Sequence, residues 1–208
     1  MTDNSLVLIS SDGSRRVVDQ IDGLTVEFRG KGSVVEIGEG AVFRNSHLIL
    51  SNRGYVSIAK THPRGILNTT ADMSGDGEGK SLGIGFGSSI EGCRFAMANE
   101  TGVSITIGQR CMLSTNITFR GGDGHTIFDP DTRKVLNRTR PIVIGDHVWI
   151  GAGATLTKGS QVASHSVVAT MAVVTRRFDQ EHVAIAGNPA QIVRRGIDWD
   201  RRYIDRFV

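Results

Sequence analysis

His125 is a candidate for proton transfer, because it sits in an insertion rather than on a packed face. It lies in the run GGDGHTIFDPDTRKVLNRTRP, residues 121–141. An alcohol is a poor nucleophile at neutral pH, so its attack on an acyl group needs a base whose pKa lies near the working pH, as that of histidine does. Asp123 can accept a hydrogen bond from the other ring nitrogen and fix the tautomer. Within GGDG, the same aspartate is equally well explained as a turn residue.

The segment that follows this run has a six-residue repeat. Aliphatic residues recur at every sixth position from residue 144, and a small or medium-sized residue stands four places after each of the first five. The aliphatic positions are Ile144, Ile150, Leu156, Val162, Val168 and Val174, and the smaller ones are Val148, Ala154, Ser160, Ser166 and Ala172. Neither an α-helix nor an alternating strand has this period, whereas a parallel β-helix does.

The repeat predicts an all-β fold in which three six-residue units make one triangular coil. Coils stack at about 4.8 Å through backbone hydrogen bonds, and the aliphatic side chains form interior columns. Partial copies of the pattern at residues 37–41, 84–88 and 107–113 extend the predicted β-helix from about residue 30 to about residue 175 of a single domain, 1–208. A chance run in a β-sandwich is the alternative, but strand alternation would not keep a six-residue phase.

Two stretches break the phase and are predicted to leave the prism as loops. The first runs from Lys60 to Lys80, and the second is the 121–141 run that carries His125. Insertions in a solenoid often build its binding face. The repeat ends after Val174, and residues 176–208 are expected to close the prism with a strand and a short helix that has Trp199 and Tyr203 on its apolar side.

Trp149 directly precedes the inward-facing Ile150, so its side chain should point out of the prism. A large aromatic is costly there unless a ligand or a neighbouring subunit covers it.

Composition narrows the class of protein. The formal charge of +3 is modest, and the basic residues gather near the C-terminus, which favours an anionic ligand over a nucleic-acid duplex. Cys93 and Cys111 are the only cysteines, and no signal peptide is recognisable, so the cytoplasm is the expected location. No apolar run approaches the ~20 residues that a membrane-spanning helix needs, so no membrane insertion is expected.

Three passages resemble the hexapeptide-repeat acyltransferases, and within them the O-acetyltransferases of sialic acid and other bacterial surface polysaccharides. They are IGDHVWIGAGATLTKGSQV (144–162), AIAGNPAQIVR (184–194) and DGHTIFD (123–129). The resemblance implies a left-handed coil, acetyl-CoA as acetyl donor, a carbohydrate acceptor, and a homotrimer with active sites between subunits. It also implies that the 121–141 insertion is the catalytic loop.

The resemblance assigns roles to individual residues. His125 would be the general base of a direct transfer without an acyl-enzyme, with Asp123 as its partner. Trp149 would line the acetyl-CoA tunnel near the thioester. The backbone amides of Ala152 and Thr170 would also contact the cofactor. Thr175 and Arg176 would lie near the adenine, Pro189 would lie beneath the nucleotide, and Arg194 would meet a phosphate. The sequence departs from the family at Gly122, where serine is common, and at Gln191, where a basic residue is common.

Other functions stay open at this point. The same scaffold can acetylate an amino sugar, serine or a xenobiotic, and histidine chemistry would look alike in all three. A zinc carbonic anhydrase of this fold needs three histidines. His147 and His165 lie eighteen residues apart and would stack, but a third histidine at family spacing is missing, so no metal is expected. A non-catalytic structural β-helix is the last alternative.

Overall fold

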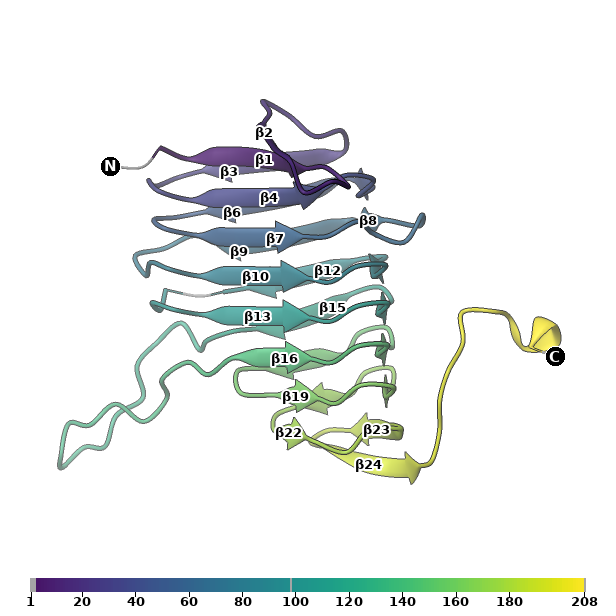
Figure 1. Cartoon of the computed structure of the whole chain (residues 1–208). Coiled ribbons are helices and arrows are strands. Elements are labelled where there is room, and N and C mark those ends of the chain that lie inside the picture. Colours follow the sequence, from purple (N-terminus) through teal and green to yellow (C-terminus); the bar gives the residue numbers. More distant parts are fainter. Residues whose placement is uncertain (1–2, 98, 208) are drawn as a thin grey trace.

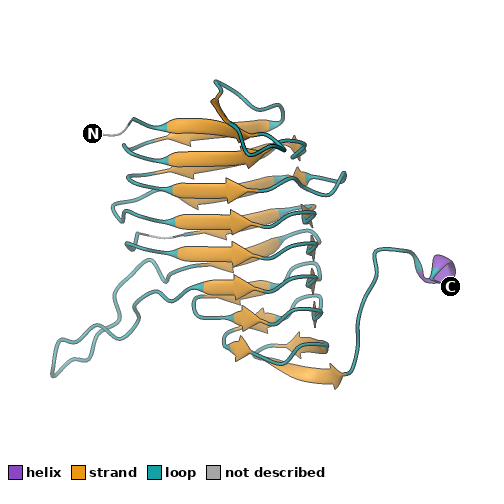
Figure 2. Cartoon of the chain, viewed as in Figure 1, coloured by secondary structure: helices purple, strands orange, loops and turns teal. Residues whose placement is uncertain are grey.

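The computed structural model describes residues 3–97 and 99–207, and nearly all of their regular structure is β-strand (Figures 1 and 2). The strands form three sheets, named A, B and C here. Sheet A contains β2 (Arg15–Val17), β1 (Ser5–Ile9), β4 (Val34–Gly38), β7 (Tyr55–Ile58), β10 (Ser81–Ile84), β13 (Ser104–Ile107), β16 (Ile142–Ile144), β19 (Gln161–Val162) and β22 (Arg177–Phe178). Sheet B contains β21 (Val173–Val174), β18 (Thr155–Thr157), β15 (Ile117–Arg120), β12 (Cys93–Ala96), β9 (Thr69–Met73), β6 (Ser46–Leu50) and β3 (Leu24–Phe28). Sheet C contains β24 (Ala190–Arg195), β23 (Val183–Gly187), β20 (Val167–Val168), β17 (Trp149–Ile150), β14 (Met112–Leu113), β11 (Ser89–Ile90), β8 (Ile66–Leu67) and β5 (Phe43–Arg44).

The chain visits sheets A, C and B in turn and so winds into a prism. In Figure 1 the strands of sheet A run to the right in front, sheet C is seen edge-on at the right, and sheet B lies behind. Seen from the N-terminal end, the chain therefore descends counter-clockwise, which makes the β-helix left-handed. This handedness runs against the strong right-handed preference of parallel crossovers. The predicted parallel β-helix and its implied handedness are both confirmed.

The hydrophobic core follows the six-residue repeat. Ile144 pairs with Val162 and Ile150 with Val168, which gives the last coils a register of eighteen residues. All six aliphatic positions from residue 144 to residue 174 are at most 2% exposed, and the five smaller residues between them are fully buried. A small residue at that position keeps the narrow interior from overfilling.

The upstream coils are longer, which explains why the repeat is faint there. Phe95 pairs with Phe119 across a register of 24 residues, and their rings stack at 4.9 Å inside the prism. Longer coils carry extra turn residues that shift the six-residue phase. The β-helix begins at β1, well before the predicted residue 30, because β1 already pairs in parallel with β4.

The predicted loop from Lys60 to Lys80 is wrong over most of its length. This stretch contains β8 and β9, with Ile66, Ala71 and Met73 at most 1% exposed. Lys80 is also buried, and its ammonium donates to the backbone oxygens of Met73 and Ser74 at 2.9 and 2.7 Å. The polar residues therefore form turns on either side of β8 and β9, and they do not form a loop that leaves the prism.

Residues 121–141 do leave the prism, as an arm between β15 and β16 (Figure 1). An antiparallel bridge between Phe128 and Val135 holds the two halves of the arm together. Because β15 belongs to sheet B and β16 to sheet A, the arm leaves from the corner where these two sheets meet.

The closing segment forms the antiparallel pair β23–β24 and then turns back beside sheet C. It ends in a single 3₁₀ turn, η1 (Ile204–Arg206), shown in purple in Figure 2. The predicted helix with Trp199 and Tyr203 on its apolar side is wrong, because both residues precede this turn and none of its residues is buried. Trp199 is 9% exposed on the extended segment before it, and Tyr203 is 70% exposed. Among the described residues, the structure contains no helix with the length and apolar character needed to cross a membrane.

Candidate active site

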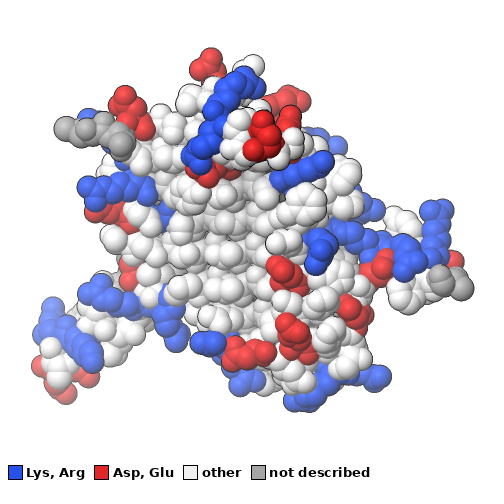
Figure 3. Space-filling view, in the orientation of Figure 1, with Lys and Arg blue, Asp and Glu red and all other residues white. Residues whose placement is uncertain are grey.

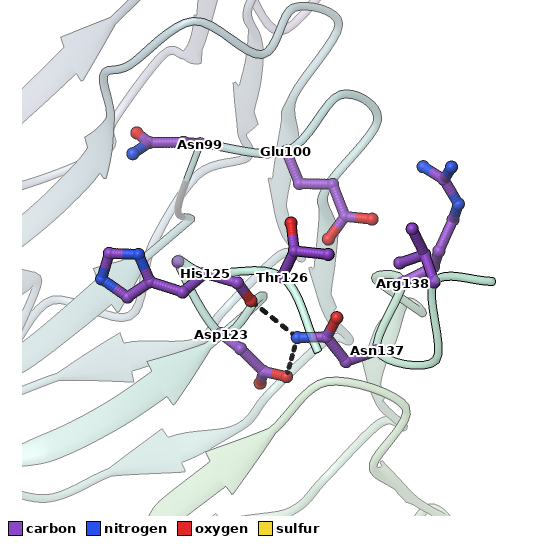
Figure 4. A pocket seen from close by; sticks show the side chains of 9 residues that line it. Asn99, Glu100, Asp123, His125, Thr126, Asn137 and Arg138 are labelled. Carbon is purple, nitrogen blue, oxygen red and sulfur yellow. Dashed lines mark hydrogen bonds between the residues drawn. The ribbon is translucent and has the colours of Figure 1, made fainter. Parts of the chain in front are cut away.

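His125 lies on the arm beside a pocket of about 290 Å³ (Figure 4). The pocket is lined by Asn99, Glu100, Asp123, Gly124, His125, Thr126, Val135, Asn137 and Arg138. The His125 side chain is exposed, and its ring points away from Asp123 and Asn137. An exposed imidazole at the rim of a pocket is free to meet an incoming hydroxyl group.

Asn137 holds the backbone around His125 in place. Its Nδ2 donates to the backbone oxygen of His125 and to Oδ2 of Asp123, both at 2.8 Å, and its Oδ1 accepts from the backbone N–H of Ile127 at 2.8 Å (Figure 4). One amide therefore joins the outgoing and returning halves of the arm. Sequence reasoning missed this residue because a single asparagine in a polar loop carries no distinguishing pattern.

The base of the arm is tied to the prism by an ion pair. Lys158 Nζ lies 2.6 Å from Asp123 Oδ2 and also donates to the backbone oxygen of Asn137. The hydrogen bond from Lys158, together with that from Asn137, holds the pKa of the Asp123 carboxyl below its usual value. In the described chain Asp123 thus accepts hydrogen bonds from Lys158 and Asn137, and the expected hydrogen bond with the imidazole of His125 is not among them.

Trp149 lies on β17 with its side chain 38% exposed, and it faces outward as the repeat predicted. It stands beside Trp199, with ring centroids 6.2 Å apart. Both rings line a pocket of about 810 Å³ together with His147, Asp198, Asp200, Arg202, Ile204 and Phe207. The closing segment thus builds one wall of the surface on which Trp149 is exposed.

His125 and Trp149 are on different sides of the prism. The arm leaves from the corner between sheets A and B, whereas Trp149 belongs to sheet C, the face opposite that corner. The two residues therefore do not form one site within a single chain.

Comparison with known proteins finds relatives that match about half of the chain. No family model matches it. It is 35% identical over 98 residues to polysialic acid O-acetyltransferases of Escherichia coli O1:K1 and of Neisseria meningitidis. The match covers 47% of this chain, 32% of the first relative and 46% of the second, so the chain spans less than half of the length of these relatives.

Among solved structures, the polySia specific acetyltransferase NeuO superposes with a TM-score of 0.79 and 27% identity, over 97% of this chain and 86% of that one. In sequence and in fold this chain is similar to the hexapeptide-repeat acyltransferases. A second structure, the polysialic acid O-acetyltransferase OatWY, shares the fold with a TM-score of 0.56 and 20% identity.

The residues that the acyltransferase resemblance assigned to the cofactor fall into three groups. Ala152 and Thr170 lie in stacked turns at the corner between sheets C and B, where the N–H of Met171 donates to the Ala152 oxygen at 2.9 Å. Thr175 and Arg176 lie at the corner between sheets B and A, the corner from which the arm leaves.

Pro189 and Arg194 form the third group, at the C-terminal end of the prism. Pro189 lies in the turn between β23 and β24 and follows a cis peptide bond, and Arg194 is exposed on β24. Gln191, the departure from the family pattern, contacts the Arg176 guanidinium through its side-chain oxygen. The third group is therefore linked to the second through this contact.

Proposed function

We propose that the protein is an O-acetyltransferase that moves an acetyl group from acetyl-CoA to a hydroxyl of a sugar in a bacterial surface polysaccharide. The observation that carries this proposal is the exposed His125 on an arm whose backbone is fixed by Asn137 and Asp123 beside a pocket. The names of the relatives support the acceptor class, since they include polysialic acid and galactoside O-acetyltransferases.

His125 acts as the general base that removes the proton from the acceptor hydroxyl as it attacks the thioester carbon. Positioned proton transfer of this kind typically accelerates a reaction by about 10²–10⁴-fold. Asp123 acts as a positioning residue, because its carboxylate ties the arm to Lys158. The proton is then available to the departing thiolate of CoA, so the step consumes acetyl-CoA and acceptor and yields ester and CoA thiol.

The transfer is direct, without an acetyl-cysteine intermediate. Cys93 and Cys111 are 5% and 0% exposed, and both line the prism interior. Burial raises the pKa of the Cys111 thiol to about 11 and that of Cys93 well above its usual value. Since the thiolate is the nucleophilic form, neither cysteine is suited to accept an acetyl group.

The acetyl-CoA site follows the residues named from the family. Trp149 flanks the thioester, the turns of Ala152 and Thr170 contact the pantetheine arm, and Thr175 with Arg176 lies near the adenine. Pro189 shapes the end of the groove and Arg194 meets a phosphate. The mixture of backbone turns and exposed arginines supports this assignment, because guanidinium groups bind phosphates through paired hydrogen bonds.

The active unit is a homotrimer in which the arm of one subunit reaches the Trp149 face of its neighbour. The separation of His125 from Trp149 supports this arrangement. So do three apolar side chains of the arm, Ile127, Phe128 and Leu136, which are 57%, 41% and 61% exposed. Exposed apolar side chains of this kind mark contact surfaces. Figure 3 shows in addition an uncharged band down the middle of sheet A on which another copy could pack.

The test is an acceptor screen. The purified protein and its His125→Ala variant are incubated with acetyl-CoA and with sialylated, hexose, amino-sugar, serine and chloramphenicol acceptors, and the release of CoA thiol is measured. We expect release with an acceptor hydroxyl and its loss in the variant. Release only with amine acceptors would refute O-transfer, and trapping of an acetylated protein in a single turnover would refute direct transfer.

A thermal shift separates the enzyme from a structural β-helix. A ligand that binds the native state must raise the melting temperature. We expect stabilisation by CoA, and its absence at millimolar concentration would contradict the proposed donor. The proposed location is the cytoplasm, where an acetyl-CoA-dependent enzyme meets its donor.

A further inference from the structure

Three histidines stack at the corner where sheet A passes into sheet C. His147, His165 and His182 occupy this corner in successive coils, all in the left-handed backbone region with φ of 52°, 57° and 58°. The ring centroids of His147 and His165 are 5.2 Å apart, and those of His165 and His182 are 4.8 Å apart. The coil repeat therefore places imidazoles in a column outside the prism.

The closing segment brings a carboxylate to this column. Asp198 Oδ1 lies 3.4 Å from His147 Nε2, and Asp198 Oδ2 lies 3.4 Å from His165 Nδ1. The three residues each present one donor atom, and these atoms lie within 4.8 Å of one another. Residues 147, 165 and 198 are far apart in the sequence, which is why spacing alone yielded only two of the three.

The two separations between Asp198 and the histidine nitrogens suit metal ligands better than direct hydrogen bonds. Charge-assisted hydrogen bonds are typically about 2.7–2.9 Å long, shorter than both carboxylate contacts. Ligand atoms about 2.0–2.1 Å from a tetrahedral zinc ion lie about 3.3–3.4 Å from one another. His165 Nδ1 is buried and has no hydrogen-bond partner among the described residues, so its lone pair is available.

Neighbouring aromatic rings fix the orientation of both imidazoles. Trp199 stacks on His147 with centroids 4.3 Å apart and an interplanar angle of 9°, and its Nε1 donates to the His147 backbone oxygen at 2.8 Å. His182 stacks on His165 at an interplanar angle of 24°. Such outer contacts are what orients ligand rings in metal sites.

We propose that His147, His165 and Asp198 form a binding site for a divalent transition-metal ion of the zinc type, completed by water. Two imidazoles and one carboxylate are a donor set that zinc accepts, whereas calcium and magnesium prefer oxygen ligands alone. His147 Nε2 lies 3.0 Å from the Trp199 backbone oxygen, so binding needs the neutral ring with its proton on Nδ1, and this contact gives way to the metal bond.

The site fastens the closing segment to the β-helix. Asp198 comes from that segment, whereas both histidines come from the coils, so one ion joins the two. Asp198 is followed by Trp199, which forms a wall of the Trp149 pocket. Metal binding would thus order the surface on which Trp149 is exposed. It can be detected without measuring acetyl transfer.

The experiment measures zinc binding to the full chain. Protein stripped with a chelator is titrated with ZnCl₂ by calorimetry, and Co²⁺ is added separately so that its visible absorption reports tetrahedral nitrogen and oxygen ligation. We expect one ion per chain, with binding at least about tenfold weaker in His165→Ala and Asp198→Asn. Mg²⁺ and Ca²⁺ should not compete.

His47→Ala is the matched control, because this histidine lies on β6 of sheet B, away from the histidine column, and contributes no donor to the cluster. It should retain zinc binding within a few fold, and circular dichroism of every variant checks that the β-helix is folded. An anomalous difference peak at the three side chains in a zinc-soaked crystal gives a second, direct readout. Equal binding in all variants, no binding in any, or a peak elsewhere would each overturn the proposal.

Discussion

His125 and Trp149 lie on opposite sides of the same β-helix, the first on the arm between sheets B and A and the second on the outer face of sheet C. Both residues are exposed in the isolated chain. An acetyl-transfer site that uses both must therefore draw them from two copies of the chain. This relationship makes the proposed homotrimer testable without a structure of the assembly.

Mixed oligomers should restore activity lost in two single variants. His125→Ala and Trp149→Ala are each expected to be almost inactive. When the two variants are co-refolded in equal amounts, about one interface in four combines an intact His125 with an intact Trp149, so about a quarter of wild-type activity should return. Steady-state CoA release measures it, and a mixture no more active than its components would show that one chain supplies both residues.

The turnover number should depend on His125 more than the affinity for acetyl-CoA does. Loss of a general base costs about 10²–10⁴-fold in rate, and His125→Ala is expected to fall in this range. The KM for acetyl-CoA should change little, because the ring is not assigned to the cofactor. His47→Ala is a suitable control, since His47 lies on the outer face of sheet B far along the prism. Comparable losses in both variants would remove the special role of His125.

Lys158 should control both the charge of Asp123 and the order of the arm. Because the Lys158 hydrogen bond lowers the pKa of the Asp123 carboxyl, Lys158→Met should raise that pKa towards its usual range. A carboxyl whose pKa is lower in the folded state stabilises the fold fully at pH values above its unfolded-state pKa. This stabilisation is lost as the pH falls through its folded-state pKa. Carboxyl NMR titration measures the pKa shift.

Hydrogen exchange supplies the second readout for Lys158. Faster exchange across residues 121–141 in Lys158→Met, with unchanged exchange in the coils, would show that the ion pair holds the arm. Unchanged exchange in the arm would mean that Asn137 and the remaining loop contacts suffice.

Close stacking of the coils should make Gly151 intolerant of any side chain. A Cβ at this position would lie 2.6 Å from the backbone nitrogen of Thr170 in the next coil, so Gly151→Ala must push two coils apart. We expect a fall in melting temperature of several degrees, consistent with about 1–3 kcal/mol for overpacking. At Gly83 the nearest atom would be 3.8 Å away, so Gly83→Ala should melt close to wild type in differential scanning calorimetry.

The last coils could be predicted from the sequence, because each contains eighteen residues and keeps the repeat in phase from Ile144 to Val174. The coils of β1 and β9 could not be predicted, because longer turns shift the six-residue phase. In addition, a polar residue such as Lys80 serves there as a buried hydrogen-bond donor. Composition alone does not distinguish such a turn from a long loop.

The candidate site could be predicted only where its residues are close in sequence. Local pattern and resemblance predicted His125 and the outward direction of Trp149, but they did not predict the hydrogen-bond partners of Asp123. Lys158 reaches Asp123 because an intervening coil brings residues 35 apart together, and Asp198 reaches His147 and His165 through the returning closing segment. Both contacts depend on tertiary structure that no local motif encodes.

The returning segment also changes how the prism should unfold. In a solenoid each repeat touches only its neighbours, so coils at one end can fray while the rest persist. Here the backbone N–H of Ile197 donates to the backbone oxygen of His182. The Arg201 guanidinium donates to the backbone oxygen of Cys111 and to Oγ of Ser89, which belong to coils that do not touch the coil of His182. The coils at the C-terminal end therefore cannot open before the closing segment detaches from the prism. Fraying at that end is suppressed, and the coils that the segment spans should unfold as one cooperative unit.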